Sequence, residues 1–504
     1  AVRRVWYNGA LYNEGVVFGG HSWKPFGISY QSMVPKKSQV LNLITPTCIS
    51  ASHVAYGAVR IEWTFMSLGE AAGIAASIAA GSDLPVQDVD YKMLAQKLKA
   101  NGAVLELPPS MHAIPATMPA FNLRAGLPNF FKKVKDNKKV RVGFIGGSIT
   151  KADEEYRRQT LQLLKTRFTK ASFEQVVAGI AGTDADLGVF RVQDQLIRKK
   201  PDLVFIEFAV NGGHAKGVEG IIRKIWEKLP NTDICLIYAV TAAQVRNYTL
   251  GEIPEHITVL EKIAQHYGIP SIHLGFHISS LIQAGKMLPV LLKGDHSGLP
   301  AFTKDGTHPT AKGGDQYGKT IDQAFSKWVN EKGQHTNLRL KAPYDPDNWQ
   351  DAVAVSPGDI KDKSGWKPIK IPQSFDYIGK GKWVDTLYAT EHTQSYIRFA
   401  FEGTELGIFD IGGPEVGQLK IIIDGNSMKF NRFNKYCNNR YRGQYFLTNL
   451  TPGRHIVELK VDADMPDKRQ ILGNNQLTDI DKNPEKYNHR FIYLGKILIR
   501  GELR

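Results

Sequence analysis

Between residues 139 and about 330, short apolar runs alternate with amphipathic segments. The apolar runs, which predict buried strands, lie at 140–145, 175–177, 203–210, 234–240 and 270–274. Helical periodicity is found at 152–168, 216–228, 253–267 and 311–329. Strands separated by helices are typical of a parallel sheet with helices on both faces. This part of the chain therefore predicts an α/β domain.

The pattern changes after residue 340. Short alternating runs at 396–401, 419–423 and 455–461 are separated by Gly, Asn, Asp and Pro. This spacing is typical of an antiparallel β-sandwich. We expect most of its aromatic residues to belong to the core, namely Trp349, Trp366, Trp383, Tyr436 and Tyr441. The Asn- and Arg-rich stretch 431–442 is interpreted as a long loop that can reach a neighbouring site.

The first hundred residues are rich in small side chains. Residues 67–80 predict a tightly packed, buried helix, which Gly81 and Pro85 end. A proline-rich linker follows, with Pro108, Pro109, Pro115 and Pro119. The sequence thus predicts a multidomain chain with a small mixed region at 1–120, an α/β domain at 121–335 and a jelly-roll-like sandwich at 336–504.

Composition narrows the class of protein. The 504 residues have 42% hydrophobic and 22% charged side chains, which is the globular norm. Cys48, Cys235 and Cys437 are too few and too far apart for a disulfide scaffold or a cysteine zinc site. No apolar run is long enough to predict a transmembrane helix. The chain begins Ala-Val-Arg-Arg, so we interpret it as a processed product or a fragment.

The net charge of +15 is spread along the chain. Its densest local run comprises Lys132, Lys133, Lys135, Lys138, Lys139 and Arg141. A solvated basic surface is the simplest interpretation. An acidic partner, such as a uronic-acid polysaccharide, is the more specific one. Nucleic acid is not expected as a partner, since no recognition motif accompanies the charge.

A serine follows the first strand of the α/β domain. Strand 140–145 leads into Gly146-Gly147-Ser148, and a helix follows. Open α/β sheets place their sites at the carboxyl ends of strands. Two glycines permit the sharp turn and leave space for a substrate. Ser148 is therefore a candidate nucleophile, although such a turn is equally often structural.

A histidine far downstream is the matching candidate base. In Asp305-Gly-Thr-His308-Pro, the carboxylate precedes the imidazole by three residues. It can orient His308 and stabilise the protonated form, while His308 accepts a proton from a serine. Gly182, after the run 175–177, can offer a backbone N–H, and Asn211, after 203–210, a side-chain N–H to an oxyanion.

Taken in order, these motifs resemble the SGNH (GDSL-like) hydrolase family over residues 139–330. Ser148, Gly182, Asn211 and His308 fall on its four name-giving positions, and Asp305 on its D-x-x-H motif. The resemblance implies a flavodoxin-like sheet, a serine nucleophile and ester hydrolysis, often carbohydrate deacetylation. The Ser148 N–H, the Gly182 N–H and Asn211 would form the oxyanion hole.

The sequence departs from the family pattern in two places. Gly147 stands where Asp is commoner, and Gly212 replaces the usual acid after Asn211. The second change affects the expected geometry of the Asn loop more than the chemistry. His214 is either a pocket residue or ordinary loop polarity.

Gly313–Thr320 also fits the P-loop pattern G-x-x-x-x-G-K-T. A P-loop needs a strand directly before it, so that its backbone can hold phosphate ahead of a helix. The Asp305–Pro309 loop stands there instead. We interpret the segment as the start of the last helix.

The first segment carries a second resemblance. Residues 23–36, 51–63 and the small-residue helix after them resemble the C-terminal part of an FAD-dependent oxidoreductase family. That family's G-x-G-x-x-G fingerprint has no match in this chain. His53 and Arg60 would be flavin-side or substrate groups in a longer protein, and otherwise loop polarity or an ion pair.

The hypothesis from the sequence is a serine esterase that deacetylates a poly- or oligosaccharide, with an acidic, pectin-like polymer as one candidate. It requires neither metal nor organic cofactor. A fragment of a flavin oxidoreductase and a carbohydrate-binding protein with an inactive hydrolase domain are the alternatives. A secreted or periplasmic location would follow only from a polysaccharide substrate.

Overall fold

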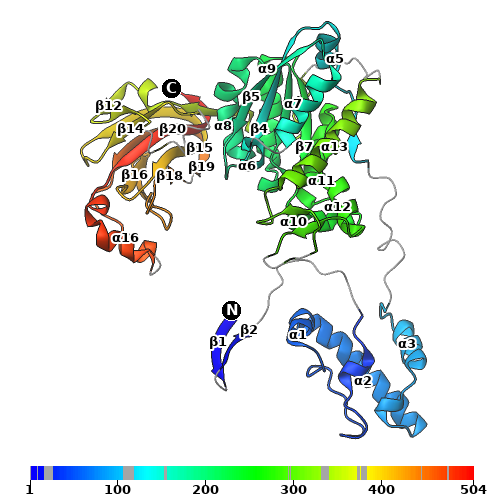
Figure 1. The fold of residues 1–504 in the computed structure, drawn as a ribbon. Helices are drawn as coiled ribbons and strands as arrows, with labels where there is room; N and C mark the ends of the chain where they lie inside the picture. The colour runs from blue at the N-terminus through cyan, green and yellow to red at the C-terminus, as the bar shows by residue number, and fades with distance from the viewer. Residues whose placement is uncertain are drawn as a thin grey trace. The chain divides into compact units, whose positions relative to one another are not determined.

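The computed structural model describes residues 2–7, 10–15, 27–105, 119–152, 156–292, 295, 297–330, 340–371, 375, 383–443, 445–473 and 476–504. The chain divides into two compact units, residues 1–116 and 117–504 (Figure 1). The predicted boundary at 335/336, Pro108, Pro109 and Pro115 of the linker, and part of the segment 23–36 lie outside the described residues.

The N-terminal unit is small and mostly helical. Strands β1 (Val2–Tyr7) and β2 (Ala10–Gly15) pair as an antiparallel hairpin. Helices α1 (His53–Val59), α2 (Glu62–Ser82) and α3 (Tyr91–Ala100) follow. A small apolar cluster, including Ala75, Ile78, Leu94 and Leu98, holds α2 against α3.

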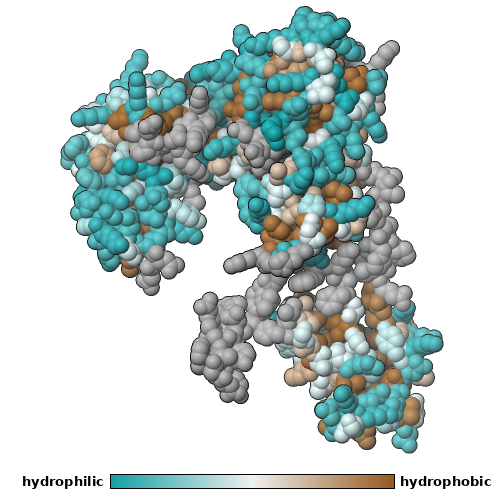
Figure 2. Space-filling model, viewed as in Figure 1, coloured by the Kyte–Doolittle hydropathy of each residue, from teal (hydrophilic) through white to brown (hydrophobic). Residues whose placement is uncertain are grey.

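The prediction of a buried helix at 67–80 was right about the helix and wrong about its burial. Within α2, only Leu68, Ala75, Ile78 and Ala79 are buried. A side chain at Gly69 or Gly73 would meet nothing within 4 Å. Among the described residues of this unit, the other side chains of the helix are at least partly exposed, and Figure 2 shows apolar surface on the unit.

The central domain (described residues 119–330) is built on a six-stranded sheet in the order β3-β8-β7-β6-β4-β5. Its strands are β3 (Phe121–Asn122), β4 (Lys139–Gly146), β5 (Ser172–Gly179), β6 (Leu203–Glu207), β7 (Asp233–Tyr238) and β8 (Ser271–His273). All pairs except β3–β8 are parallel. Leaving out β3, the order is that of flavodoxin-like sheets, as expected, and the switch point lies between β4 and β6.

Helices cover both faces of this sheet (Figure 1). One apolar cluster combines the sheet with α8 (Ala185–Gln195), α9 (Ala215–Lys228) and α11 (Glu255–Tyr267). The other includes α5 (Pro128–Lys135), α7 (Tyr156–Arg167), α10 (Ala242–Thr249), α12 (Gly275–Gln283) and α13 (Ala311–Trp328). The apparent P-loop lies within α13, as its lack of a preceding strand indicated.

The predicted strand 203–210 is shorter in the structure. Strand β6 ends at Glu207, and Ala209–Asn211 form a 3₁₀ turn (η4). The apolar side chains of Phe208 and Ala209 are buried although they lie beyond the strand. The prediction was too long because it rested on hydrophobicity, which a buried turn shares with a buried strand. This turn carries Asn211 away from the sheet.

The C-terminal domain (described residues 340–504) is antiparallel, as predicted. Its ten strands form one bonded network in the described part, comprising β11 (Ala352–Val355), β12 (Asp362–Ser364), β13 (Lys367–Lys370), β14 (Thr386–Thr390), β15 (Tyr396–Gly412), β16 (Gln418–Ile423), β17 (Asn426–Asn431), β18 (Tyr441–Arg442), β19 (Phe446–Val461) and β20 (Ile492–Leu503). Each pairing is antiparallel. The jelly-roll form stays a prediction.

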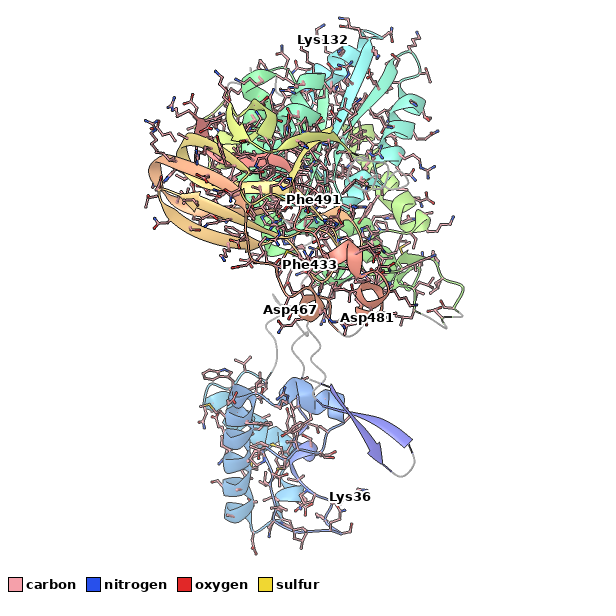
Figure 3. The ribbon with its side chains drawn as sticks, turned by 90° about the vertical axis from the view of Figure 1, so that its left-hand side faces the viewer. Lys36, Lys132, Phe433, Asp467, Asp481 and Phe491 are labelled. Atoms are coloured by element: carbon pink, nitrogen blue, oxygen red, sulfur yellow. The ribbon has the colours of Figure 1, made fainter. Side chains whose placement is uncertain are left out.

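Most of the aromatic residues assigned to the core are in it. Trp366 and Trp383 are buried, and Trp349 and Tyr441 pack against the apolar cluster that spans both domains. Tyr436 is the exception, since it is exposed. Phe433 and Phe491, labelled in Figure 3, contact the same cluster.

The basic run at 132–141 lies at the amino end of β4, opposite the carboxyl ends of the strands. Lys132 and Lys138 pair with Asp136, Lys133 pairs with Asp202, and Lys139 and Arg141 pair with Glu174. Lys132 points outward (Figure 3). These exposed pairs fit the simpler interpretation, a solvated basic surface.

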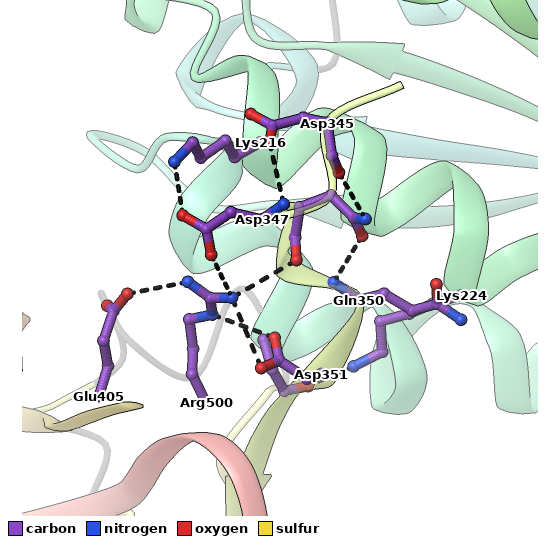
Figure 4. A network of polar contacts seen from close by, with 10 residues as sticks. Lys216, Lys224, Asp345, Asp347, Gln350, Asp351, Glu405 and Arg500 are labelled. Carbon is purple, nitrogen blue, oxygen red and sulfur yellow. Dashed lines mark hydrogen bonds and ion pairs between the residues drawn. The ribbon is translucent and has the colours of Figure 1, made fainter. Parts of the chain in front are cut away.

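A polar network connects the two domains of the larger unit (Figure 4). The Arg500 guanidinium of β20 contacts the carboxylates of Asp347, Asp351 and Glu405, each at 3.0 Å. Lys216 of α9 reaches Asp347 at 2.6 Å. The side chain of Arg500 is only 7% exposed, so its charge depends on these partners.

Replacing Arg500 by alanine would remove the cation that Asp351 and Glu405 contact and would leave Asp347 with Lys216 alone. We expect R500A to lower the free energy of unfolding by about 3 kcal/mol, measured by urea denaturation. The matched control is R504A, whose exposed arginine pairs with Glu402 and Glu502 in solvent and should change stability far less than R500A does. Equal effects of the two variants would contradict the role given to Arg500.

Candidate active site

The turn that presents Ser148 has no room for side chains. Strand β4 ends at Gly146, and the short helix α6 (Ser148–Lys151) begins at Ser148. A Cβ on Gly146 would lie 2.0 Å from the Thr150 Oγ1 atom and 2.4 Å from the Glu207 carbonyl oxygen. A Cβ on Gly147 would lie 2.3 Å from Asn211 Oδ1. Glycine at both positions is therefore required for the turn as it stands.

The structure brings Ser148, His308 and Asp305 into one chain of hydrogen bonds. The Ser148 Oγ atom lies 2.8 Å from His308 Nε2. The opposite ring nitrogen, Nδ1, lies 2.7 Å from Asp305 Oδ2. Their side chains remain open to solvent, with 44% of His308 and 57% of Asp305 exposed. A substrate can therefore reach the imidazole and the hydroxyl together.

Asp305 is held as a carboxylate. The His308 side chain, followed by the backbone N–H groups of His308 and Thr307, lowers the pKa of Asp305 to about 2. The two backbone N–H groups donate to Oδ1 at 2.8 and 2.9 Å. Since Oδ2 is left to face Nδ1, the carboxylate favours a proton on Nδ1 and leaves Nε2 able to accept from Ser148.

The loops that carry Gly182 and Asn211 meet beside the same turn. Gly182 follows β5 and has a φ of 66°, which a residue with a side chain rarely adopts. A Cβ on Gly147 would lie 3.2 Å from the Thr183 carbonyl oxygen as well as against Asn211. The ends of β4, β5 and β6 thus place the serine, glycine and asparagine motifs around one point.

The departures from the family pattern have local explanations. Because Asn211 occupies the space beside Gly147, an aspartate there could not fit without displacing it. The Asn loop closes through backbone bonds from the Asn211 and Gly213 N–H groups to the Phe208 carbonyl oxygen, both 3.0 Å. Gly212 and Gly213 take positive φ values of 86° and 77°. Glycine at positions 212 and 213 therefore allows a backbone conformation that residues with a side chain rarely adopt.

His214 lies next to this loop and pairs with an acid. Its Nδ1 atom is 2.7 Å from Asp186, which raises the pKa of the imidazole, and Nε2 is 3.9 Å from Asp184. The ligand atoms of these three residues lie within 4.8 Å of one another, close enough to hold a metal ion. The Asp184 Oδ1 atom accepts from the Leu187 N–H, which caps α8, and from the Tyr445 hydroxyl. The two carboxylates and the imidazole are therefore close together because each binds a neighbouring group of the protein.

A buried arginine under the site was not predicted from the sequence. Arg191 of α8 is fully buried, and its guanidinium donates to the carbonyl oxygens of Ala178 and Gly146, the latter at 2.8 Å. These carbonyls stand at the carboxyl ends of β5 and β4. Burial lowers the pKa of Arg191 to about 9. No helix was predicted at 185–195, and arginine is common in helices, so the sequence carried no signal for the burial of this residue.

Glu207, the last residue of β6, is also fully buried. Its carboxyl lies near the Thr150 hydroxyl of α6 and the backbone N–H groups of Ala209 and Val210. Burial raises the pKa of Glu207 to about 8, so the acid is protonated at neutral pH. It fills the space between the serine helix and the Asn loop.

Comparison with solved structures identifies the fold of the larger part of the chain. A two-domain esterase (CEX) active on acetylated mannans matches 76% of this chain and 96% of its own, with 19% identity and a TM-score of 0.58. The same type of esterase co-crystallized with mannopentaose matches with 18% identity over 75% of this chain and 94% of its own, at a TM-score of 0.56. The predicted resemblance to an esterase fold is confirmed.

Other comparisons add less. The acetylxylan esterase Axe2 of Geobacillus stearothermophilus matches 40% of this chain and 97% of its own with 16% identity, and its TM-score of 0.28 is below the level that shows a shared fold. The family model of FAD dependent oxidoreductases matches residues 13–98, which confirms the resemblance expected for the first segment. No curated protein sequence matches this chain.

The buried acid gives a stability prediction. Because Glu207 keeps its proton in the folded state up to about pH 8 while the unfolded chain loses it near pH 4.5, folding loses stability as the pH rises between these values. We expect E207Q to remove this loss, so that the variant gains on the native protein by at most about 1.4 kcal/mol per pH unit. Urea denaturation at pH 5 and pH 8 measures the free energy of unfolding of both proteins. If E207Q lost as much stability between these pH values as the native protein does, the prediction would be contradicted.

Proposed function

We propose that this protein is a serine esterase that removes acetyl groups from a poly- or oligosaccharide. The observation that carries the proposal is the continuous contact from Ser148 through His308 to Asp305. This is the arrangement that activates a serine hydroxyl for acyl transfer. An intact arrangement of this kind disfavours the alternative of an inactive hydrolase domain.

In the proposed reaction, Ser148 Oγ attacks the ester carbonyl carbon while its proton moves to His308 Nε2. The carbonyl electron pair moves onto oxygen, and the backbone N–H groups of Ser148 and Gly182 and the amide of Asn211 bind that oxyanion. The oxyanion collapses, the bond to the sugar oxygen breaks, and His308 gives its proton to the leaving hydroxyl. Water then repeats the sequence, with His308 as base, and releases acetate.

A carbohydrate substrate is supported by the fold and by the open site. The two-domain esterases that share this fold act on acetylated mannans. The basic run at 132–141 is paired with acids and lies at the opposite end of β4, so it gives no support to a pectin-like substrate. We therefore place a neutral acetylated glycan ahead of an acidic one. On this proposal a secreted or periplasmic protein would be expected.

A second candidate function concerns the N-terminal unit alone. The family model at 13–98 and the exposed side chains of Trp63 and Met66 favour a piece of a flavin oxidoreductase domain. Arg60 ends α1, and the side chain of His53 lies outside the described ones.

No helix in the described residues is long and apolar enough to cross a membrane. The division at 1–120, 121–335 and 336–504 remains our proposal for the domains.

Removing the serine hydroxyl should abolish acetate release. We expect S148A to lower kcat by about 10⁴-fold or more on acetylated mannan, xylan, pectin and a small aryl acetate. The control is S280A, an exposed serine of α12, which should leave kcat within about twofold. Release that persists in S148A would contradict the assignment of the nucleophile, and the order of the four substrates ranks the glycans.

The flavin alternative has a separate test. If the N-terminal unit holds FAD, the purified chain or the chain mixed with FAD should show protein-bound flavin absorbance after gel filtration. We expect none, because the chain has no fingerprint for the dinucleotide pyrophosphate. Bound flavin in stoichiometric amount would favour the oxidoreductase function for this unit.

A further inference from the structure

The C-terminal domain reaches directly into the loop that carries Gly182. The Nη2 atom of Arg442, on strand β18, donates to the Gly182 carbonyl oxygen at 2.9 Å. The Tyr445 hydroxyl donates to Asp184 Oδ1 at 2.5 Å. Both contacts join residues about 260 positions apart in the sequence. The loop after β5 is therefore held by side chains of another domain.

Arg442 is itself placed by the sheet. Strand β18 pairs with β15, so that Arg442 faces Ile411 and Tyr441 faces Gly412. The second nitrogen of the guanidinium, Nη1, donates to the Gly443 carbonyl oxygen at 3.1 Å. The side chain is thus directed at Gly182 by a strand and by its own backbone.

Gly182 needs such support. Its φ of 66° lies in the left-handed region, which glycine adopts without steric cost but which no side chain of its own helps to hold. A Cβ on Gly182 would lie 3.2 Å from Arg442 Nη2, so the guanidinium packs directly over the glycine. Asp184, which Tyr445 contacts, is the residue directly before α8, and its carboxylate accepts a hydrogen bond from the Leu187 N–H and so caps that helix.

We propose that Arg442 and Tyr445 are positioning residues of the esterase site, which hold the Gly182–Asp184 loop so that the Gly182 N–H faces the ester oxygen. The inference rests on the proposed function and adds to it that the C-terminal domain completes the oxyanion hole. Neither residue has to touch the substrate. A mispositioned donor costs transition-state stabilisation while leaving substrate binding largely unchanged.

The kinetic test uses the full chain and a small aryl acetate, which is too short to engage a separate sugar-binding surface. We expect R442A to lower kcat by about 10- to 100-fold with KM within about twofold, and Y445F to lower kcat by a smaller factor. Guanidinium ion should restore part of the activity of R442A. The control is R398A, an exposed arginine of the same sheet that pairs with Glu458.

Two results would overturn the inference. One is an unchanged kcat of R442A on the aryl acetate. The other is an effect confined to KM on the polysaccharide, which would make Arg442 a sugar-binding residue. If R442A fails to fold, R442K and Y445F carry the same test, since each preserves most of its side chain.

Hydrogen exchange separates this inference from the proposed function. We expect the backbone amides of residues 179–187 to exchange at least tenfold faster in R442A than in the native protein, with the exchange of β7 unchanged. This readout needs no turnover. Unchanged exchange at 179–187 would overturn the positioning role, whereas a native protein inactive on every acetate would overturn the esterase proposal instead.

Discussion

The candidate site depends on the buried guanidinium of Arg191. It binds the carbonyl oxygens at the ends of β4 and β5, at the positions from which the serine and glycine loops depart. The guanidinium also lies over the aromatic ring of Phe208, in the segment after β6, with its central carbon 5.9 Å from the ring centre. Two strand ends are thus held by hydrogen bonds from one fully buried side chain, which also contacts the segment after a third strand.

Close packing of glycines completes this constraint. Gly146, Gly147 and Gly179 each have neighbouring atoms where a Cβ would stand, at 2.0, 2.3 and 2.5 Å. Glycine is needed there because loops from three strands approach within contact distance of one another. The sheet order brings those loops to the switch point, and Arg191 and the glycines determine how closely they meet.

The motifs and the sheet could be predicted because they are local. A strand and its following turn occupy few residues, and Asp305 and His308 are three positions apart, so their patterns are visible in the sequence. The parallel topology then brings distant motifs to one edge. Arg191, Glu207 and the Arg442–Gly182 contact could not be found in this way, because their roles arise from packing between elements far apart in the chain. The stretch 431–442 was expected to reach a neighbouring site, and Arg442 at its end does so.

The burial of α2 was mispredicted for the same reason, since small side chains indicate close packing but not the element that provides it.

The most direct test of the account is covalent labelling by a fluorophosphonate probe, which reacts only with an activated serine hydroxyl and releases fluoride. Mass spectrometry should find one phosphonyl group per chain on Ser148, and none on the H308A variant. A native protein that stays unlabelled, or that is labelled at another serine, would contradict the assignment of Ser148 as an activated nucleophile.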